Sequence, residues 1–302
     1  MRILLTGRNG QVGWELHRAL APLGDVVAFD RQGADLSRPE TIAPLVASVQ
    51  PDVIVNAAAY TAVDNAEKEE ALAQRVNADA AGELAGAARK LKALLVHYST
   101  DYVFDGRSAE PYREHDPVAP LNAYGRTKLA GEQAIEAAGG DWLTLRTTWV
   151  YGVRGRNFLR TMLRLGCERE TLRVVADQIG VPTSARMIAD LTAQVISRAQ
   201  RERSDGAFAS GLFHMTASGR TDWHGFASAI ISAAREAGRL PIKTTSVEPI
   251  TSREFPTPAA RPGFSVLDNS RFDERFRLHR MDWREALALV MDDLLVGGSS
   301  LN

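Results

Sequence analysis

Apolar and polar positions in the first half of the chain alternate between short apolar runs and longer stretches with helical periodicity. The runs lack polar alternation, as expected for parallel strands covered on both faces, and predict strands at residues 2–6, 26–29, 52–56, 93–98 and 142–147. The periodic stretches predict helices at residues 14–20, 40–49, 67–92 and 124–138. This order predicts an α/β fold, a Rossmann-type doubly wound parallel sheet with helices on both faces.

Beyond residue 150 the regular alternation loosens. The pattern there predicts helices at residues 157–167, 186–199 and 222–237, with short strands at 172–175 and 212–215. We therefore expect residues 1–150 to form the sheet domain and residues 151–302 mainly a smaller C-terminal α+β lobe. Segments at about 176–212 are expected to return to the sheet domain.

Composition narrows the class of protein. With 302 residues, 45% hydrophobic content and a formal net charge of −1, the chain is typical of a globular protein and offers no basic field for nucleic acid. The only cysteine, Cys167, excludes an internal disulfide, and the six histidines lack metal-ligand spacing. No segment approaches the ~20 apolar residues of a spanning helix. We expect a cytoplasmic protein without membrane or nucleic-acid partners.

A glycine-patterned turn follows the first predicted strand directly. Gly7, Gly10 and Gly13 have the spacing G-x-x-G-x-x-G and lead into a predicted helix. Glycines in this context let the backbone approach a pyrophosphate, and the amides of Gln11 and Val12 can donate to it from the helix start. The first domain is therefore predicted to bind NAD(P).

The end of the second predicted strand bears on the choice of cofactor. Asp30 stands about 20 positions beyond the glycines, where an acidic side chain binds the ribose hydroxyls of NAD, whereas a neighbouring cation such as Arg31 can balance a 2′-phosphate. Asp30 therefore favours NADH as the cofactor, whereas Arg31 favours NADPH. We expect NADPH to be used, with NADH also possible.

Two later segments are expected at the same edge of the sheet, because ligands bind beyond the carboxyl ends of parallel strands. The small residues after the third strand let the backbone pass close under a cofactor, which makes Ala59, Tyr60 and Thr61 candidates for its nicotinamide end, with Val63 looking toward the substrate. After the fourth strand come Thr100 and its neighbours.

Tyr124 and Lys128 lie four residues apart on a predicted helix and so share one face. An ammonium beside a phenol favours the ionised form of the phenol, so the pair makes a tunable proton donor.

Several ordered motifs together carry a family resemblance. They are 7–15 (GRNGQVGWE), 55–64 (VNAAAYTAVD), 97–104 (HYSTDYVF), 124–132 (YGRTKLAGE), 146–151 (RTTWVY) and the Arg-Pro segment at 256–262. The chain resembles the extended short-chain dehydrogenase/reductases that act on nucleotide sugars, and specifically the dTDP-4-dehydrorhamnose reductases. The resemblance spans nearly the whole chain.

The resemblance implies reduction of the C4 keto group of dTDP-4-dehydro-L-rhamnose by a nicotinamide cofactor, in the synthesis of a cell-surface polysaccharide precursor. Tyr124 is then the proton donor, Lys128 bonds the nicotinamide ribose and lowers the Tyr124 pKa, and Thr100 bonds the substrate oxygen or the phenol. Asp35 and Leu36 line the adenine pocket.

For the substrate, the resemblance and the chemistry of a hydroxyl-rich sugar diphosphate together suggest further contacts. Asp101 is expected to accept hydrogen bonds from the sugar, Tyr102 and Trp149 to border its ring, and Arg261 to face the diphosphate, since a guanidinium suits phosphate oxygens.

Alternatives stay open at this point. Related 4,6-dehydratases carry Asp-Glu after the Thr, whereas this chain has Asp101-Tyr102, which argues against dehydration. Another nucleotide-sugar 4-reductase, a 4-epimerase or a non-catalytic dinucleotide-binding regulatory subunit would share most of the motifs. The nucleotide base and the C4 stereochemistry of the product are not fixed by motif spacing.

Some members of the resembling family form a dimer bridged by magnesium, with an acidic residue at the position of Glu15. Asp190 is a second candidate ligand, but Arg186 lies one helical turn before it and places a fixed positive charge there. We therefore expect no bridging metal, and a monomer or weak homodimer.

Overall fold

The computed structural model describes residues 1–296 and centres on a six-stranded sheet. The strands lie in the order β10-β5-β4-β3-β1-β2, and every neighbouring pair is parallel. Their bounds are β1 Arg2–Thr6, β2 Asp25–Phe29, β3 Val53–Asn56, β4 Leu94–Thr100, β5 Asp141–Thr147 and β10 Gly211–His214. The predicted Rossmann-type sheet is confirmed.

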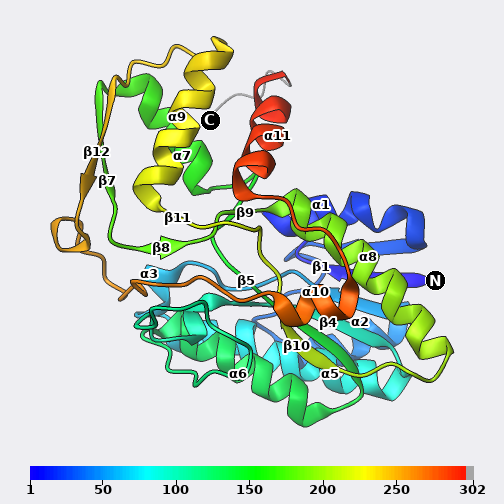
Figure 1. Cartoon of the computed structure of the whole chain (residues 1–302). Coiled ribbons are helices and arrows are strands. Elements are labelled where there is room, and N and C mark those ends of the chain that lie inside the picture. The colour runs from blue at the N-terminus through cyan, green and yellow to red at the C-terminus, as the bar shows by residue number, and fades with distance from the viewer. Residues whose placement is uncertain (297–302) are drawn as a thin grey trace.

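Helices cover both faces of this sheet, as Figure 1 shows. On one face α1 (Gln11–Ala19) packs against α8 (Ala185–Ser204), and on the other α5 (Ala80–Leu91) lies between α2 (Ile42–Val49) and α6 (Ala123–Ala138). Successive β1 side chains point to opposite faces, so Leu5 joins one hydrophobic core and Leu4 the other, both fully buried. This explains why the strand is apolar throughout.

A second group of elements lies beside the sheet (Figure 1). Its main helices are α7 (Phe158–Glu168), α9 (Trp223–Ala237) and α11 (Trp283–Val296), and its strands β7 (Thr171–Val175) and β12 (Ser246–Ile250) pair in parallel. Short strand pairs join this lobe to the rest: β6 (Val150–Tyr151) with β9 (Thr183–Ser184), and β8 (Ile179–Gly180) with β11 (Thr221–Asp222). Helix α10 (Ser270–Phe276) packs beside β10. Within residues 1–296, no helix combines the length and apolarity needed to cross a bilayer.

Two expectations about the elements were wrong. The strand predicted in the lobe at residues 212–215 is β10, an edge strand of the main sheet paired with β5, because an apolar pattern identifies a strand but not its partner. The helix predicted at residues 67–92 is interrupted: α4 (Glu70–Gln74) passes through a π turn at Arg75–Asp79 before α5 begins. The predicted division of the chain near residue 150 stays a prediction.

The π turn has a packing role. Its Asn77 donates to the Tyr60 carbonyl (3.1 Å) and accepts from the Tyr60 amide (2.8 Å), which fixes the segment after β3. The backbone of Asn77 also touches α6 at Gly131, where an added Cβ would lie 2.2 Å from the Asn77 carbonyl oxygen. The close approach of the two helices therefore depends on glycine.

We expect Gly131→Ala and Gly86→Ala to shift the melting temperature in opposite directions. At Gly131 the methyl group must displace backbone, a form of overpacking that costs about 1–3 kcal/mol. At Gly86, inside α5, an added Cβ meets nothing within 4 Å, so alanine gains about 0.5–1 kcal/mol through helix propensity. Thermal denaturation of the two variants checks this, and shifts of the same sign would contradict it.

Candidate active site

A cleft of about 1010 Å³ lies beyond the carboxyl ends of β1, β3, β4 and β5. Nearly all residues predicted from the sequence line it: Gly7, Gly10, Gln11, Val12, Asp30, Arg31, Asp35, Leu36, Ala59, Tyr60, Thr61, Val63, Thr100, Asp101, Tyr102, Tyr124, Lys128, Trp149 and Arg261. The structure thus brings together segments spread over 250 residues of chain at one edge of the sheet.

Gly13 is the one predicted residue that does not line the cleft. It lies inside α1 against the turn, and a Cβ there would come within 2.0 Å of the Gly7 carbonyl oxygen. Gly7 itself has φ +77° and passes so close to Ala57 that a Cβ would lie 2.8 Å from the Ala57 carbonyl carbon. The turn is therefore a cradle that side chains would fill, and it fits a pyrophosphate held by backbone amides.

The end of β2 presents an ordered carboxylate to the cleft. Asp30 accepts from the amides of Gln32 (3.0 Å) and Gly33 (3.2 Å) and from the Asn9 side chain (3.2 Å), and these backbone bonds hold its pKa below the ordinary value. The neighbouring Arg31 side chain is 79% exposed, with Asp35 3.7 Å away. A hydrogen-bond acceptor and an exposed cation thus flank the same end of the cleft.

Thr100, Asp101 and Tyr124 meet where β4 ends. Asp101 is buried and accepts from the hydroxyls of Thr100 and Thr148, each at 3.0 Å. Burial raises the pKa of Asp101 to about 6 despite these donors. Burial also raises the pKa of Tyr124 to about 12, although Thr100 acts in the opposite direction. Both groups are pushed toward their neutral forms.

Lys128 is held differently from our expectation. It is 2% exposed, and its Nζ donates to the Tyr98 carbonyl at 2.6 Å and lies 3.1 Å from His97 Nε2. Burial lowers the pKa of Lys128 to about 8. In the structure the Nζ atom is bonded to β4, and desolvation is the largest influence on the phenol, so the prediction that Lys128 lowers the Tyr124 pKa stays a prediction.

A buried ion pair fixes the helix that carries Tyr124 and Lys128. Arg146 on β5 donates to both carboxylate oxygens of Glu132 on α6, at 2.8 and 2.7 Å, and both side chains are less than a tenth exposed. A bidentate pair of this kind defines both distance and angle. It sets the position of α6 relative to the sheet one turn beyond Lys128.

Aromatic side chains form the side of the cleft nearest the lobe. Trp149 has a left-handed backbone (φ +45°) and stacks on Trp223 at the start of α9, with ring centroids 3.5 Å apart and planes 8° apart. Phe158 packs on the far edge of the same stack. On the opposite side, Tyr102 meets Tyr124 edge to face at 5.5 Å. These surfaces are suited to the faces of sugar and base rings.

Arg261 lines the cleft but is already paired. Its guanidinium donates to both oxygens of Asp64, at 2.6 and 2.9 Å, and to the Ala259 carbonyl. The expected contact with a diphosphate stays a prediction.

Some lining residues were missed by sequence reasoning. They are Asn9, Ala34, Ser37, Ala57, Ala58, Leu72, Val76, Tyr98, Ser99, Thr147, Thr148, Val150, Gly155, Arg156, Phe158 and Trp223. The glycine- and arginine-rich stretch after Tyr151 was a usable signal for Gly155 and Arg156. No local pattern pointed to Trp223, which reaches the cleft from the lobe.

Two of the residues weighed for a metal site, Glu15 and Arg186, lie within ion-pair distance of each other. Arg186 lies 3.5 Å from a Glu15 carboxylate oxygen and 2.7 Å from one of Asp293, and so ties α8 to α1 and α11. Burial raises the pKa of the neighbouring Asp190. Among residues 1–296, no three His, Cys, Asp or Glu side chains are grouped to hold a metal ion.

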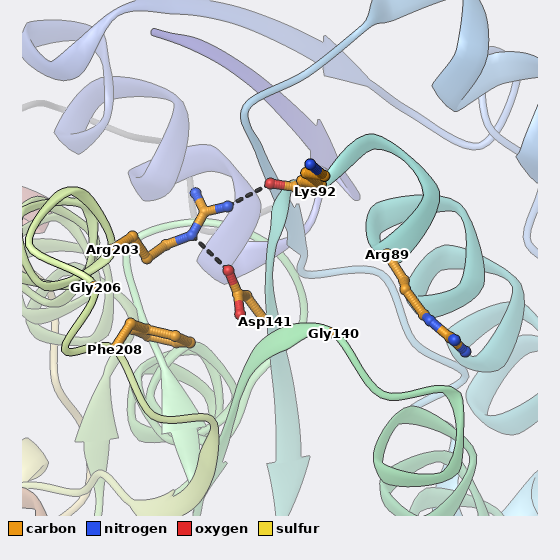
Figure 2. A pocket seen from close by; sticks show the side chains of 7 residues that line it. All are labelled: Arg89, Lys92, Gly140, Asp141, Arg203, Gly206 and Phe208. Carbon is orange, nitrogen blue, oxygen red and sulfur yellow. Dashed lines mark hydrogen bonds and ion pairs between the residues drawn. The ribbon is translucent and has the colours of Figure 1, made fainter.

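A second cavity, of about 420 Å³, lies at the opposite end of the strands, near the starts of β4 and β5 (Figure 2). Arg203 donates there to Asp141 (2.8 Å) and to the Lys92 carbonyl, while Arg89 points away from this cluster. None of the predicted site residues lies in it.

Comparison with known proteins identifies the family. A family model described as the RmlD substrate binding domain matches residues 1–296. The chain belongs to this family. A dTDP-4-dehydrorhamnose reductase from Burkholderia thailandensis is 56% identical over 296 residues, covering 98% of this chain and 99% of the relative.

Solved structures agree with this membership. A dTDP-4-dehydrorhamnose reductase from Clostridium acetobutylicum superposes with a TM-score of 0.88 at 38% identity, over 97% of this chain and 99% of that one. The family member from Bacillus anthracis, solved in complex with NADP, has a TM-score of 0.88 at 36% identity, with the same coverage of both chains. The family resemblance found in the sequence is confirmed.

The raised pKa of Asp101 predicts a pH dependence of stability. A carboxyl whose folded pKa lies near 6, above its ordinary 3.8, stabilises the fold when protonated, and this stability is lost as pH rises from about 4 to 6. The difference corresponds to about 3 kcal/mol at full ionisation. Melting temperatures of the natural chain and of Asp101→Asn, measured from pH 4 to 8, are expected to converge at the acid end and diverge above it in favour of the variant. Parallel curves would contradict the raised pKa.

Proposed function

We propose that this chain reduces the C4 keto group of dTDP-4-dehydro-L-rhamnose to give dTDP-L-rhamnose. The observation that carries the proposal is the convergence of Thr100, Tyr124 and Lys128 on one cleft with a glycine cradle, in a chain whose relatives are dTDP-4-dehydrorhamnose reductases. The chain is then an NADPH-dependent oxidoreductase, with NADH as a possible second donor. Its product serves the synthesis of cell-surface polysaccharide.

The cleft suits a dinucleotide along its length. The cradle at Gly7 and Gly10 fits the pyrophosphate, with the amides of Gln11 and Val12 as donors at the start of α1. Asp30 and Arg31 lie at the adenosine end with Asp35 and Leu36, and the Ala59–Thr61 segment lies toward the nicotinamide end. When bound, the reduced nicotinamide supplies the hydride.

The chain's own residues manage the proton. As hydride reaches C4, the carbonyl oxygen becomes an alkoxide, and Tyr124 gives it the phenol proton, so that ketone, hydride and proton together make the alcohol. A phenol with a pKa of about 12 is fully protonated at neutral pH and ready to donate. Thr100 orients the oxygen, and Lys128 completes the site by bonding the nicotinamide ribose.

The sugar nucleotide is proposed to lie between the two aromatic surfaces. Tyr102 and Val63 border the sugar on one side, and Trp149 borders it on the other, over Trp223. Asp101 orients Thr100 and receives hydrogen bonds from the sugar, and Arg261 faces the diphosphate from its pair with Asp64. An epimerase or a regulatory subunit would use the same fold, and turnover separates them from a reductase.

The remaining proposals concern assembly and setting. We propose a cytoplasmic monomer or weak homodimer with no bridging metal, because the fixed positive charge of Arg186 already lies beside Glu15 and Asp293 and makes a further cation there unfavourable. The domain made by residues 1–150 is proposed to bind the cofactor, and residues 151–302 to supply mainly the substrate side.

Tyr124→Phe is expected to lower turnover about 10²–10⁴-fold, because it removes the proton donor, while the affinity for NADPH changes little. The measurement is loss of reduced-nicotinamide absorbance with enzymatically prepared dTDP-4-dehydro-L-rhamnose. Tyr151→Phe is the matched control, since the buried Tyr151 hydroxyl lies outside the cleft and makes no hydrogen bond among the described residues. Equal rates for the natural chain and Tyr124→Phe would overturn the role of Tyr124, and no turnover by the natural chain would overturn the function.

Arg31→Ala is expected to weaken NADPH binding about tenfold and to leave NADH binding unchanged. The exposed guanidinium is placed to pair with the 2′-phosphate, which NADH lacks. Titration of cofactor fluorescence with both cofactors checks this. Equal losses for the two would show that Arg31 does not contact the 2′-phosphate.

A further inference from the structure

A buried chain of hydrogen-bonded polar side chains connects β1 to Lys128. Thr6 donates to Asn56 Oδ1 (2.7 Å), Asn56 Nδ2 lies 3.0 Å from His97 Nδ1, and His97 Nε2 lies 3.1 Å from Lys128 Nζ. All four side chains are at most 2% exposed. The reaction proposed above leaves His97 without a role.

The amide of Asn56 has one orientation that satisfies its neighbours. Its Oδ1 accepts from Thr6 and from the Ala58 backbone amide at 3.3 Å, which is a donor that cannot reverse. The Nδ2 group therefore faces His97, and His97 Nδ1 must be the acceptor.

This acceptor role determines where the imidazole carries its proton. Burial lowers the pKa of His97 well below its ordinary value, so the ring is neutral. A neutral imidazole that accepts at Nδ1 carries its proton on Nε2. The Nε2–H group consequently points at Lys128 Nζ.

A charged lysine cannot receive that bond. An ammonium has three donors and no acceptor, whereas a neutral amine accepts at its lone pair and still donates. The Nζ–H bond to the Tyr98 carbonyl is compatible with the amine. The geometry around Nζ thus favours one donated and one accepted hydrogen bond.

We propose that His97 is a positioning residue which, with its tautomer set by Asn56, favours the neutral amine of Lys128 over the ammonium when the cleft contains no cofactor. The value of this state for catalysis rests on the function proposed above.

The other charges near Lys128 do not reverse this balance. Glu132, one turn further along α6, favours the ammonium, but Arg146 from β5 occupies both of its carboxylate oxygens. The phenol of Tyr124 is neutral and contributes no charge, and the carboxyl of Asp101 is engaged by Thr100 and Thr148.

The arrangement couples the lysine to the cofactor side of the cleft. For Lys128 to become an ammonium in place, the ring proton must move to Nδ1 and the Asn56 amide must turn over, which leaves the Ala58 amide without its acceptor. Ala58 lines the cleft. A ligand that accepts a hydrogen bond from the Ala58 amide would therefore favour protonation of Lys128, and protonation of Lys128 would favour binding of that ligand.

Long-range ¹H–¹⁵N spectra of the full chain labelled at histidine test the proposal without any sugar. His97 is assigned through His97→Gln, and we expect Nε2 protonated and Nδ1 unprotonated at about pH 9, above the Lys128 pKa of about 8. A ring protonated at Nδ1, or an imidazolium, would overturn it. The tautomer is read from the natural chain and the variant serves only for assignment, so failure of sugar reduction leaves the result intact.

Asn56→Asp supplies the second measurement. A carboxylate at this position accepts from Nδ1–H, so the tautomer should switch and the titration of the Lys128 amine should move up by about one pH unit or more, roughly tenfold in proton affinity. The lysine signal is followed by ¹⁵N or ¹³Cε labelling. His214→Gln, a change at a fully buried histidine on β10, is the control and should leave both signals in place. An unchanged Lys128 titration in a folded Asn56→Asp protein would overturn the proposal.

Discussion

The bidentate pair between Arg146 and Glu132 is the interaction on which the site depends most. It lies inside the protein between β5 and α6, where two unpaired charges would be strongly unfavourable, and removing one partner of such a pair costs about 3–5 kcal/mol. Residue 146 is directly beside Ser99 in the sheet, and Thr147 beside Thr100. A single contact therefore relates the helix that carries the phenol and the amine to the strand end that carries the hydroxyl.

Desolvation controls the charges of the site once that geometry is set. It raises the pKa of Asp101 and Tyr124 and lowers that of Lys128, in each case as the largest cause. Burial therefore shifts the protonation equilibrium of each group toward its uncharged form. Charged side chains that line the cleft elsewhere include Asp30, Arg31 and Arg261.

The features that could be predicted from the sequence are those encoded locally. The strand, glycine turn and helix around Gly7 are contiguous, and Tyr124 and Lys128 share a helix face by spacing alone, so both were placed correctly in the cleft. The topological rule for parallel sheets then brought the strand ends together. Prediction was weakest for partners distant in sequence.

Three contacts show why such partners were missed. Trp223 lines the cleft by stacking on Trp149, and Arg261 pairs with Asp64, which is nearly 200 residues away in the sequence. The Lys128 amine lies beside His97. Each of these contacts joins residues that only the tertiary structure brings together. The local hydrophobic pattern of the sequence carries no information about which of several possible partners a side chain contacts. The same limit moved β10 from the lobe to the sheet.

The position of β10 has a consequence for how the chain folds as it is made. Strand β5 ends at Thr147, but its second neighbour in the sheet begins only at Gly211, after α7 and α8 have been synthesised. Until then one edge of β5 carries unpaired backbone groups, an edge that readily pairs with another chain. A nascent chain that stops before residue 211 thus has an incomplete sheet, and the first lobe segments, α7 and β7, leave the ribosome before the last strand of that sheet.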